Sequence, residues 1–201
     1  MKSLKLMVVM LFTSITTMSV GQEKINSYDL SYFKEPTNSI SVSESEEGID
    51  FYIEVPSRDR SEVSLIVREK SLDKFKSVIN DAKLTYAKWK KTAEENDVSD
   101  LDKEIEIDKM NIECAFHYGS WNFDFSVNLK ARFKILNGEY MLIFQNKYKL
   151  ESSSNEYIDA DGFLLAFNSE EEIDNFLKSL SLDDAKNYFN KKTSKEDLFK
   201  D

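Results

Sequence analysis

Residues 121–135 have the sequence WNFDFSVNLKARFKI, with an apolar residue at every odd position and a polar or charged residue at every even one. Strict alternation over this length predicts a β-strand with one face in a hydrophobic core and the other in water. The row that the pattern assigns to the core is Trp121, Phe123, Phe125, Val127, Leu129, Ala131, Phe133 and Ile135. A strand of about 50 Å if straight has to coil or bend within one domain.

Turn signals flank this strand on both sides. Asn137-Gly138 is the strongest short hairpin signal, because both residues tolerate the positive φ angles of a type I′ turn. Its register would pair Ile135 with Tyr140, Phe133 with Leu142 and Ala131 with Phe144. Gly119-Ser120 as a two-residue turn would pair Tyr118 with Trp121, Phe116 with Phe123 and Cys114 with Phe125. We therefore expect an antiparallel meander over residues 112–150, in which a one-residue slip would expose the apolar row.

The segment before the meander changes period from two to about three and a half. Alternating apolar residues predict a hairpin over residues 40–55 and a further strand over 63–67. Apolar residues then recur at three- and four-residue steps, which predicts a long helix from an N-cap at Ser71 to about Asn96. Ile105 and Ile107 alternate with glutamates and predict another strand.

The segment after the meander predicts a hairpin and then helices. Residues 157–167 indicate a hairpin that turns at Asp161-Gly162. Ser169 begins a capping box for a helix, and Ser181 is a suitable cap for a following one. The expected fold class is α+β: a strongly twisted antiparallel sheet of about 7–8 strands, with the long helix on one face and one or two C-terminal helices.

The N-terminus has the features of a signal peptide. Lys2 and Lys5 precede an apolar run over residues 6–12, and Ser19-Val20-Gly21 provides small residues before a cut that leaves Gln22. We therefore expect residues 1–21 to be removed and the mature chain to be periplasmic or extracellular, without membrane insertion. Within it we expect an N-terminal arm at 22–38, one domain at 39–190 and a frayed tail at 191–201.

Composition excludes several classes of function. A net charge of −10 and a pI near 4.8 argue against nucleic-acid binding, which requires a basic surface. The five glycines lie far apart, so glycine-rich phosphate loops are absent and no cofactor is predicted. His117 is the only histidine, which rules out a metal motif built on paired histidines. Phe163 stands where a calcium loop starting at Asp159 needs its third oxygen ligand.

The remaining nucleophile and base do not form a pair. Cys114 and His117 are three positions apart on one strand, so their side chains are expected on opposite faces, Cys114 buried and His117 in water opposite Asn122. We predict no catalytic residues, although a hydrolase that uses carboxylates is a third hypothesis.

Large aromatic side chains are the one candidate for a ligand site: Trp121, Phe123, Phe125, Tyr140 and, on the long helix, Trp89. Packed together they make a core, and held apart by a curled sheet they would line an apolar pocket. The function expected first is an exported, non-catalytic binding protein that acts on a protein partner, as inhibitors and immunity proteins do. The alternative is a carrier of an apolar small molecule between sheet and helix. A cavity of several hundred Å³ or so would favour the carrier, and an exposed apolar patch rimmed by acids would favour the partner.

Overall fold

The computed structural model describes residues 22–33, 37–59 and 62–197, so the expected signal peptide lies outside the described residues. The α+β architecture is confirmed: nine antiparallel strands form one sheet in the order β1-β2-β3-β4-β6-β7-β8-β11, with β5 paired to β7, and β9 and β10 form a separate pair. The strands are β1 (Glu23–Tyr28), β2 (Asn38–Ser45), β3 (Gly48–Val55), β4 (Val63–Arg68), β5 (Leu101–Ile105), β6 (Asn111–Tyr118), β7 (Ser120–Leu136), β8 (Glu139–Asn146), β9 (Leu150–Glu151), β10 (Asp159–Ala160) and β11 (Leu164–Phe167).

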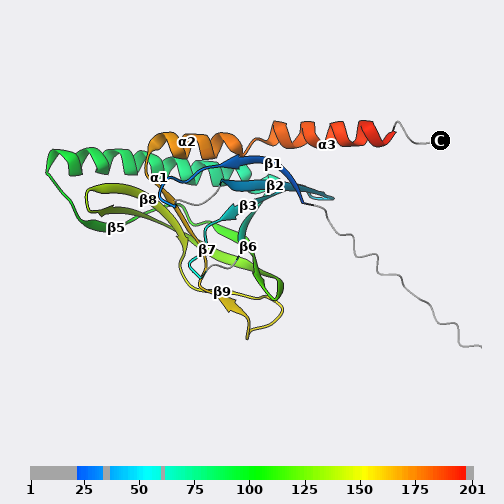
Figure 1. Ribbon diagram of the computed structural model, residues 1–201, viewed down its shortest axis with the longest axis horizontal. Coiled ribbons are helices and arrows are strands. Elements are labelled where there is room, and N and C mark those ends of the chain that lie inside the picture. The colour runs from blue at the N-terminus through cyan, green and yellow to red at the C-terminus, as the bar shows by residue number, and fades with distance from the viewer. Residues whose placement is uncertain (1–21, 34–36, 60–61, 198–201) are drawn as a thin grey trace, which may run out of the picture.

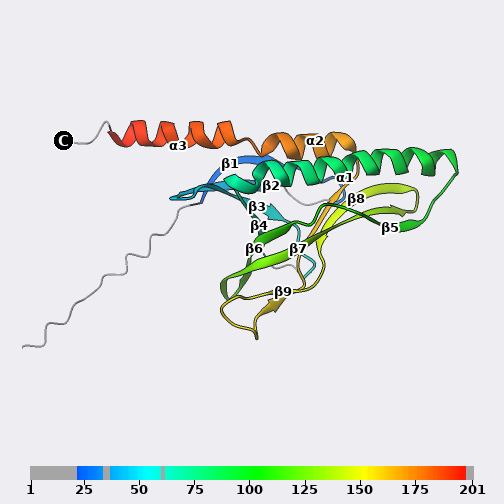
Figure 2. The same cartoon turned by 180° about the vertical axis from the view of Figure 1, so that it is seen from behind.

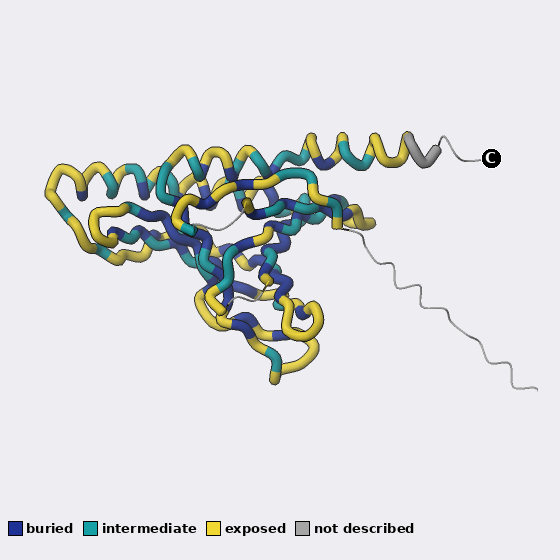
Figure 3. Tube along the Cα trace, in the orientation of Figure 1, coloured by how far each residue is buried: buried dark blue, intermediate teal, exposed yellow. Residues whose placement is uncertain are grey.

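Helix α1 (Glu69–Glu95) runs along one face of the sheet, and α2 (Glu170–Ser179) lies beside it (Figure 1). α3 (Leu182–Asp197) continues past the sheet (Figure 2). The apolar stripe of α1 is buried as its period predicts: Leu72, Phe75, Val78, Ile79, Ala82, Tyr86 and Ala93. Dark blue marks the buried residues where the sheet meets the helices (Figure 3). Burial of this stripe, rather than intrinsic propensity, supplies most of the stability of such a helix.

The start of α1 differs from the prediction. The helix begins at Glu69, directly after β4, and its N-cap Arg68 makes no side-chain capping bond, so Ser71 is not the N-cap. The Glu69 carboxylate instead accepts a hydrogen bond from Ile49 N at 3.1 Å in the neighbouring strand. The N-terminus of α1 therefore has no local side-chain cap and is held instead by this contact with β3. The caps of the later helices are confirmed, because Ser169 and Ser181 accept hydrogen bonds from the third residue after each.

The sheet curls until β11, at one end of it, reaches the chain that follows β3. Leu164 N donates to Pro56 O at 2.9 Å, and Arg58 N donates to Gly162 O at 3.0 Å. These bonds join the chain after β3 to the start of β11. The path from β3 through β4, β6, β7 and β8 to β11 thus returns to β3, and the long strand β7 coils to make this closure possible.

Four segments differ in detail from the structure expected for them. The arm expected at residues 22–38 contains the edge strand β1, which pairs with β2 and buries Tyr28. The tail expected from Lys191 is helical to Asp197. The hairpin expected around Asp161-Gly162 is wrong, because β10 pairs with β9 whereas β11 pairs with β8. The strand expected around Ile105 and Ile107 ends at Ile105.

Candidate functional site

The turn at Asn137-Gly138 has the predicted register, with Ile135 opposite Tyr140. Its two residues have φ angles of 52° and 80°, as a type I′ turn requires. The other turn is wrong by one residue. Tyr118 pairs with Ser120, His117 with Trp121 and Phe116 with Asn122, so Gly119, at φ 69°, is the only residue between the strands.

A β-bulge restores the register further along. Ile112 pairs with Val127, but Cys114 pairs with Asp124, so Phe125 and Ser126 together stand opposite one residue of β6. One extra residue reverses the alternation of faces along a strand. The odd positions from Val127 to Ile135 are therefore buried as predicted, whereas the odd positions before the bulge point outward. Trp121, Phe123 and Phe125 are 49%, 37% and 56% exposed. Their predicted place in the core is wrong.

Polar side chains take the inward positions that the aromatic residues leave. Asn122 is buried, donates to Ser120 O at 2.8 Å and accepts from the Ser152 hydroxyl at 3.1 Å. The Asp124 carboxylate accepts one hydrogen bond from Ser126 N at 2.9 Å and another from Glu151 N at 3.1 Å. Because its polar groups are satisfied, this inward row can replace an aromatic one without the cost of unpaired buried groups. Because Ser126 is one of the two bulge residues, its hydrogen bond to the Asp124 carboxylate crosses the bulge.

The outward-facing residues of β7 are charged on one side of the bulge and aromatic on the other. Beyond it, the outward residues are charged and paired: Arg132 lies 2.7 Å from Asp102 Oδ1, and Lys130 pairs with Glu104. Before it, the same outer face carries three aromatic rings. Charged, ion-paired positions are what a solvated sheet face requires, so the aromatic half needs another explanation.

We call Trp121, Phe123 and Phe125 the aromatic face. The Phe123 and Phe125 rings are parallel within 8°, with centroids 6.1 Å apart, and the His117 ring meets Trp121 edge-on at 5.5 Å. Tyr118 is also exposed, but it pairs with Ser120 and therefore lies on the opposite face of the sheet. Contiguous exposed aromatic surface of this kind marks interaction sites in soluble proteins.

Acidic residues lie on the same face of the sheet as the aromatic face, on the strands β6 and β3. The register places Phe123 opposite Ala115, Ala115 opposite Ser64, and Ser64 opposite Glu54. Asp50 lies opposite Arg68, whose guanidinium already pairs with Glu113 at 2.9 Å. Burial raises the pKa of the Asp50 carboxyl, although the Arg68 charge opposes this shift. Carboxylates therefore outnumber cations on the strands beside the aromatic face.

The other two aromatic candidates lie far from this surface in the fold. Trp89 contacts the Phe133 ring edge-on at 5.9 Å, and Tyr140 stacks on Phe133 at 6.4 Å. Tyr86 reaches the same ring at 5.8 Å. Side chains therefore fill the space between α1 and this part of β7. The five candidates split into a packed group around Phe133 and an exposed group before the bulge.

Cys114 and His117 are on opposite faces, as predicted. Cys114 is fully buried, and this burial raises the pKa of its thiol well above the usual range, so it stays protonated. His117 is exposed and pairs with Trp121 rather than with Asn122. The described part of the chain contains no group of three or more histidine, cysteine or acidic residues that could hold a metal ion. Within the same residues, no helix is long and apolar enough to cross a membrane.

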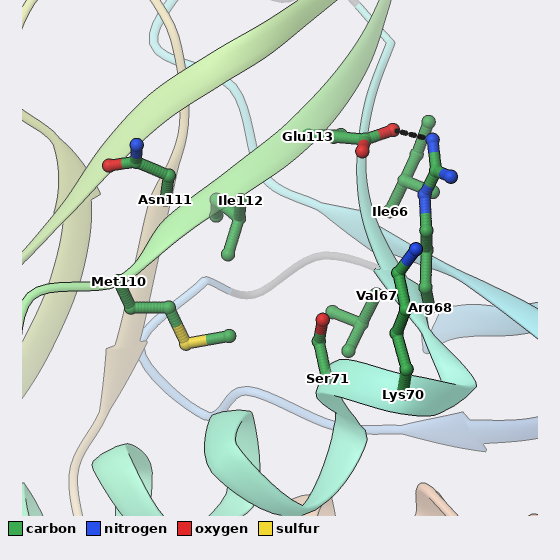
Figure 4. A pocket seen from close by; sticks show the side chains of 9 residues that line it. All are labelled: Ile66, Val67, Arg68, Lys70, Ser71, Met110, Asn111, Ile112 and Glu113. Carbon is green, nitrogen blue, oxygen red and sulfur yellow. Dashed lines mark hydrogen bonds and ion pairs between the residues drawn. The ribbon is translucent and has the colours of Figure 1, made fainter.

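The hollows on the surface are open grooves. One of about 410 Å³ lies between residues 124–128 of β7 and residues 148–153, and Phe125 forms part of its wall. A second of about 550 Å³ adjoins it across Tyr148 and Asn128. Figure 4 shows a smaller one, of about 170 Å³, at the start of α1, where the Arg68–Glu113 ion pair lies at its rim.

The alternation places Asp124 on the solvent face of the strand, which is wrong, and nothing in the sequence assigned Tyr148 or Glu151 to this surface. Asp124-Phe125-Ser126 contains a usable signal, because an aspartate often accepts a hydrogen bond from the amide two residues later and so marks an irregularity in a strand. No local pattern indicates that Tyr148 and Glu151 return to the side of β7. Comparison with family models, with curated proteins and with solved structures finds no match to this chain. Inferences about function therefore rest on this geometry.

Proposed function

We propose that this chain is an exported, non-catalytic binding protein that acts on a protein partner through the aromatic face, in the manner of an inhibitor or immunity protein. The observation that carries the proposal is the row of Trp121, Phe123 and Phe125, which are 49%, 37% and 56% exposed on one sheet face. Tryptophan and other aromatic residues dominate the energetics of protein interfaces. The neighbouring carboxylates suit a partner whose surface is basic.

Two features of the fold support a functional role for this surface. The bulge turns three aromatic side chains outward while Asn122 and Ser152 occupy the interior. A sequence under selection for stability alone would place the aromatic residues inside, because each buries roughly 150–250 Å². On the same outer face beyond the bulge, β7 carries Lys130 and Arg132, which form ion pairs. These charged residues are what a solvated sheet face normally carries, in contrast to the aromatic residues before the bulge.

The other two functions receive less support from the contacts. A carrier needs free space between α1 and the meander, where Trp89, Tyr86 and Tyr140 all contact the Phe133 ring. A hydrolase that uses carboxylates needs two of them in a cleft with pKa values driven apart. Asp124 and Glu151 both line the groove beside the bulge, but that groove is open to solvent. The Asp124 carboxylate already accepts hydrogen bonds from two backbone amides.

The test is affinity capture from the culture or periplasmic fraction of the source cells with the mature chain as bait. The decisive variant replaces Trp121, Phe123 and Phe125 by serine together. Two single variants are matched controls because they remove exposed apolar side chains elsewhere: Tyr157→Ser, at a residue 88% exposed, and Leu84→Ser, at one 61% exposed. Circular dichroism verifies that each bait is folded.

We expect one protein to be retained by the wild-type and control baits and lost from the triple variant, with binding reproduced between the purified proteins. Retention by the triple variant would place the partner's site elsewhere. Turnover in a broad hydrolase screen, abolished by one Asp, Glu or His117 substitution, would overturn the non-catalytic part. Intact mass of the exported chain tests processing: a species beginning at Gln22 is expected, and one that keeps Met1 contradicts export.

A further inference from the structure

The groove beside Phe125 exists because β8 leaves β7 at the bulge. Pairing of these strands ends at Leu129 and Asn146, after which Lys147 N donates to Asn128 O at 3.2 Å. Backbone-to-backbone hydrogen bonding resumes where Ser153 N donates to Phe123 O at 2.8 Å, and before it Glu151 N reaches β7 through the Asp124 side chain. The intervening residues leave a hollow of about 410 Å³, and Phe125 is one of the residues that line it.

Two aromatic rings and two carboxylates line this groove. Phe125 is 56% and Tyr148 65% exposed, so both rings offer free surface. The lining carboxylates are Asp124 and Glu151. The Asp124 oxygens accept bonds from backbone amides, while the Glu151 carboxylate has no hydrogen bond or ion pair with any other residue that the structure describes. The exposed Glu151 carboxylate is therefore available to a ligand.

The one cation in the lining is already neutralised. Lys149 Nζ lies 3.0 Å from Asp159, and this hydrogen bond raises the pKa of Lys149. Lys147 Nζ lies 4.8 Å from the centroid of the Tyr148 ring, so this ring already has a cation of the chain itself over it. An aromatic wall beside an unpaired carboxylate attracts a cation through the ring quadrupole and through the charge together.

We propose that this groove receives an arginine side chain of the protein partner. Its guanidinium stacks on Phe125 and donates hydrogen bonds to the Glu151 carboxylate. Arginine fits better than lysine because the planar guanidinium stacks on rings and binds a carboxylate through two N–H groups. Phosphate groups and anionic lipid are disfavoured by the carboxylates of the lining. The inference rests on the proposed function, since the arginine belongs to the protein that the aromatic face binds.

The experiment uses three capped peptides in which glycine alternates with arginine, with lysine or with citrulline, the uncharged analogue of arginine. Each is titrated against the mature chain by calorimetry and by amide NMR shifts at low ionic strength. Glu151→Gln and Phe125→Ala are the test variants. Glu156→Gln is the matched control, since it removes the same charge from an exposed position outside the lining of the groove.

The arginine peptide is expected to bind about threefold to fivefold more tightly than the lysine peptide, which reflects stacking, and the citrulline peptide to bind least. Glu151→Gln and Phe125→Ala should each weaken the arginine peptide about threefold or more, with Glu156→Gln much closer to wild type. Equal losses in Glu151→Gln and Glu156→Gln, or equal affinity for arginine and lysine, would overturn the inference. The capture experiment separates the two proposals. If the arginine inference fails but the triple aromatic variant still loses the captured partner, the proposed function stands. If the triple variant retains the partner, both the proposed function and the arginine inference fail.

Discussion

Asp124→Ala should destabilise the protein by removing the clamp on the β7 bulge. Its carboxylate accepts hydrogen bonds from Ser126 N at 2.9 Å and Glu151 N at 3.1 Å. A hydrogen bond to a charged group contributes about 1.5–3 kcal/mol. Both donor residues are exposed, so water replaces part of each bond. The expected loss in the free energy of unfolding is therefore about 2 kcal/mol, and about half of that for Asp124→Asn, which keeps one acceptor oxygen.

Urea denaturation measures this loss, with Asp100→Ala as the control at an exposed carboxylate, for which a change within about 0.5 kcal/mol is expected. Loss of the bulge would also turn Trp121 toward the interior. Iodide quenching of Trp121 fluorescence, measured in a Trp89→Phe background, should then decrease. A destabilisation below about 0.5 kcal/mol with unchanged quenching would show that Asp124 does not fix the bulge, and the account of the aromatic face would need another cause.

Three further predictions concern the core. Gly162→Ala should lower the free energy of unfolding by about 3 kcal/mol, because the φ of Gly162 is 98° and an added Cβ would collide with the Asn146 side-chain amide, whose oxygen accepts from Phe163 N. Gly138→Ala is the control, because Gly138 has a φ of 80° but open space around it. Its loss of stability in the same urea melts should be clearly smaller. Cys114 should resist Ellman's reagent in native buffer and react once the protein is unfolded, because it is buried with a raised pKa; rapid native labelling would contradict this. Trp89→Ala should cost about 3 kcal/mol, at the low end for tryptophan because the ring is only half-buried against Phe133, and a loss below about 1 kcal/mol would show that this contact does not hold α1 to the sheet.

Local signals in the sequence were sufficient for the regular parts of the fold. The stripe from Leu72 to Ala93 predicts the buried face of α1, and the Asn137-Gly138 turn predicts the register of β7 with β8 residue by residue. Ser169 and Ser181 predict their helix starts. Each of these features depends on residues within a few positions of one another, where periodicity, turn geometry and capping act without help from the rest of the chain.

Only the tertiary structure decided on which side of the sheet the aromatic residues lie. Their alternation is perfect from Trp121 to Ile135, and alternation fixes which residues share a face but not where an extra residue reverses it. At the reversal, the Asp124 carboxylate accepts a hydrogen bond from the amide of Glu151, 27 positions away. Contacts between segments so far apart in the chain leave no mark on a local pattern. The sequence therefore determined the strand, and the return of residues 148–153 to its side determined that three of its aromatic rings face the solvent.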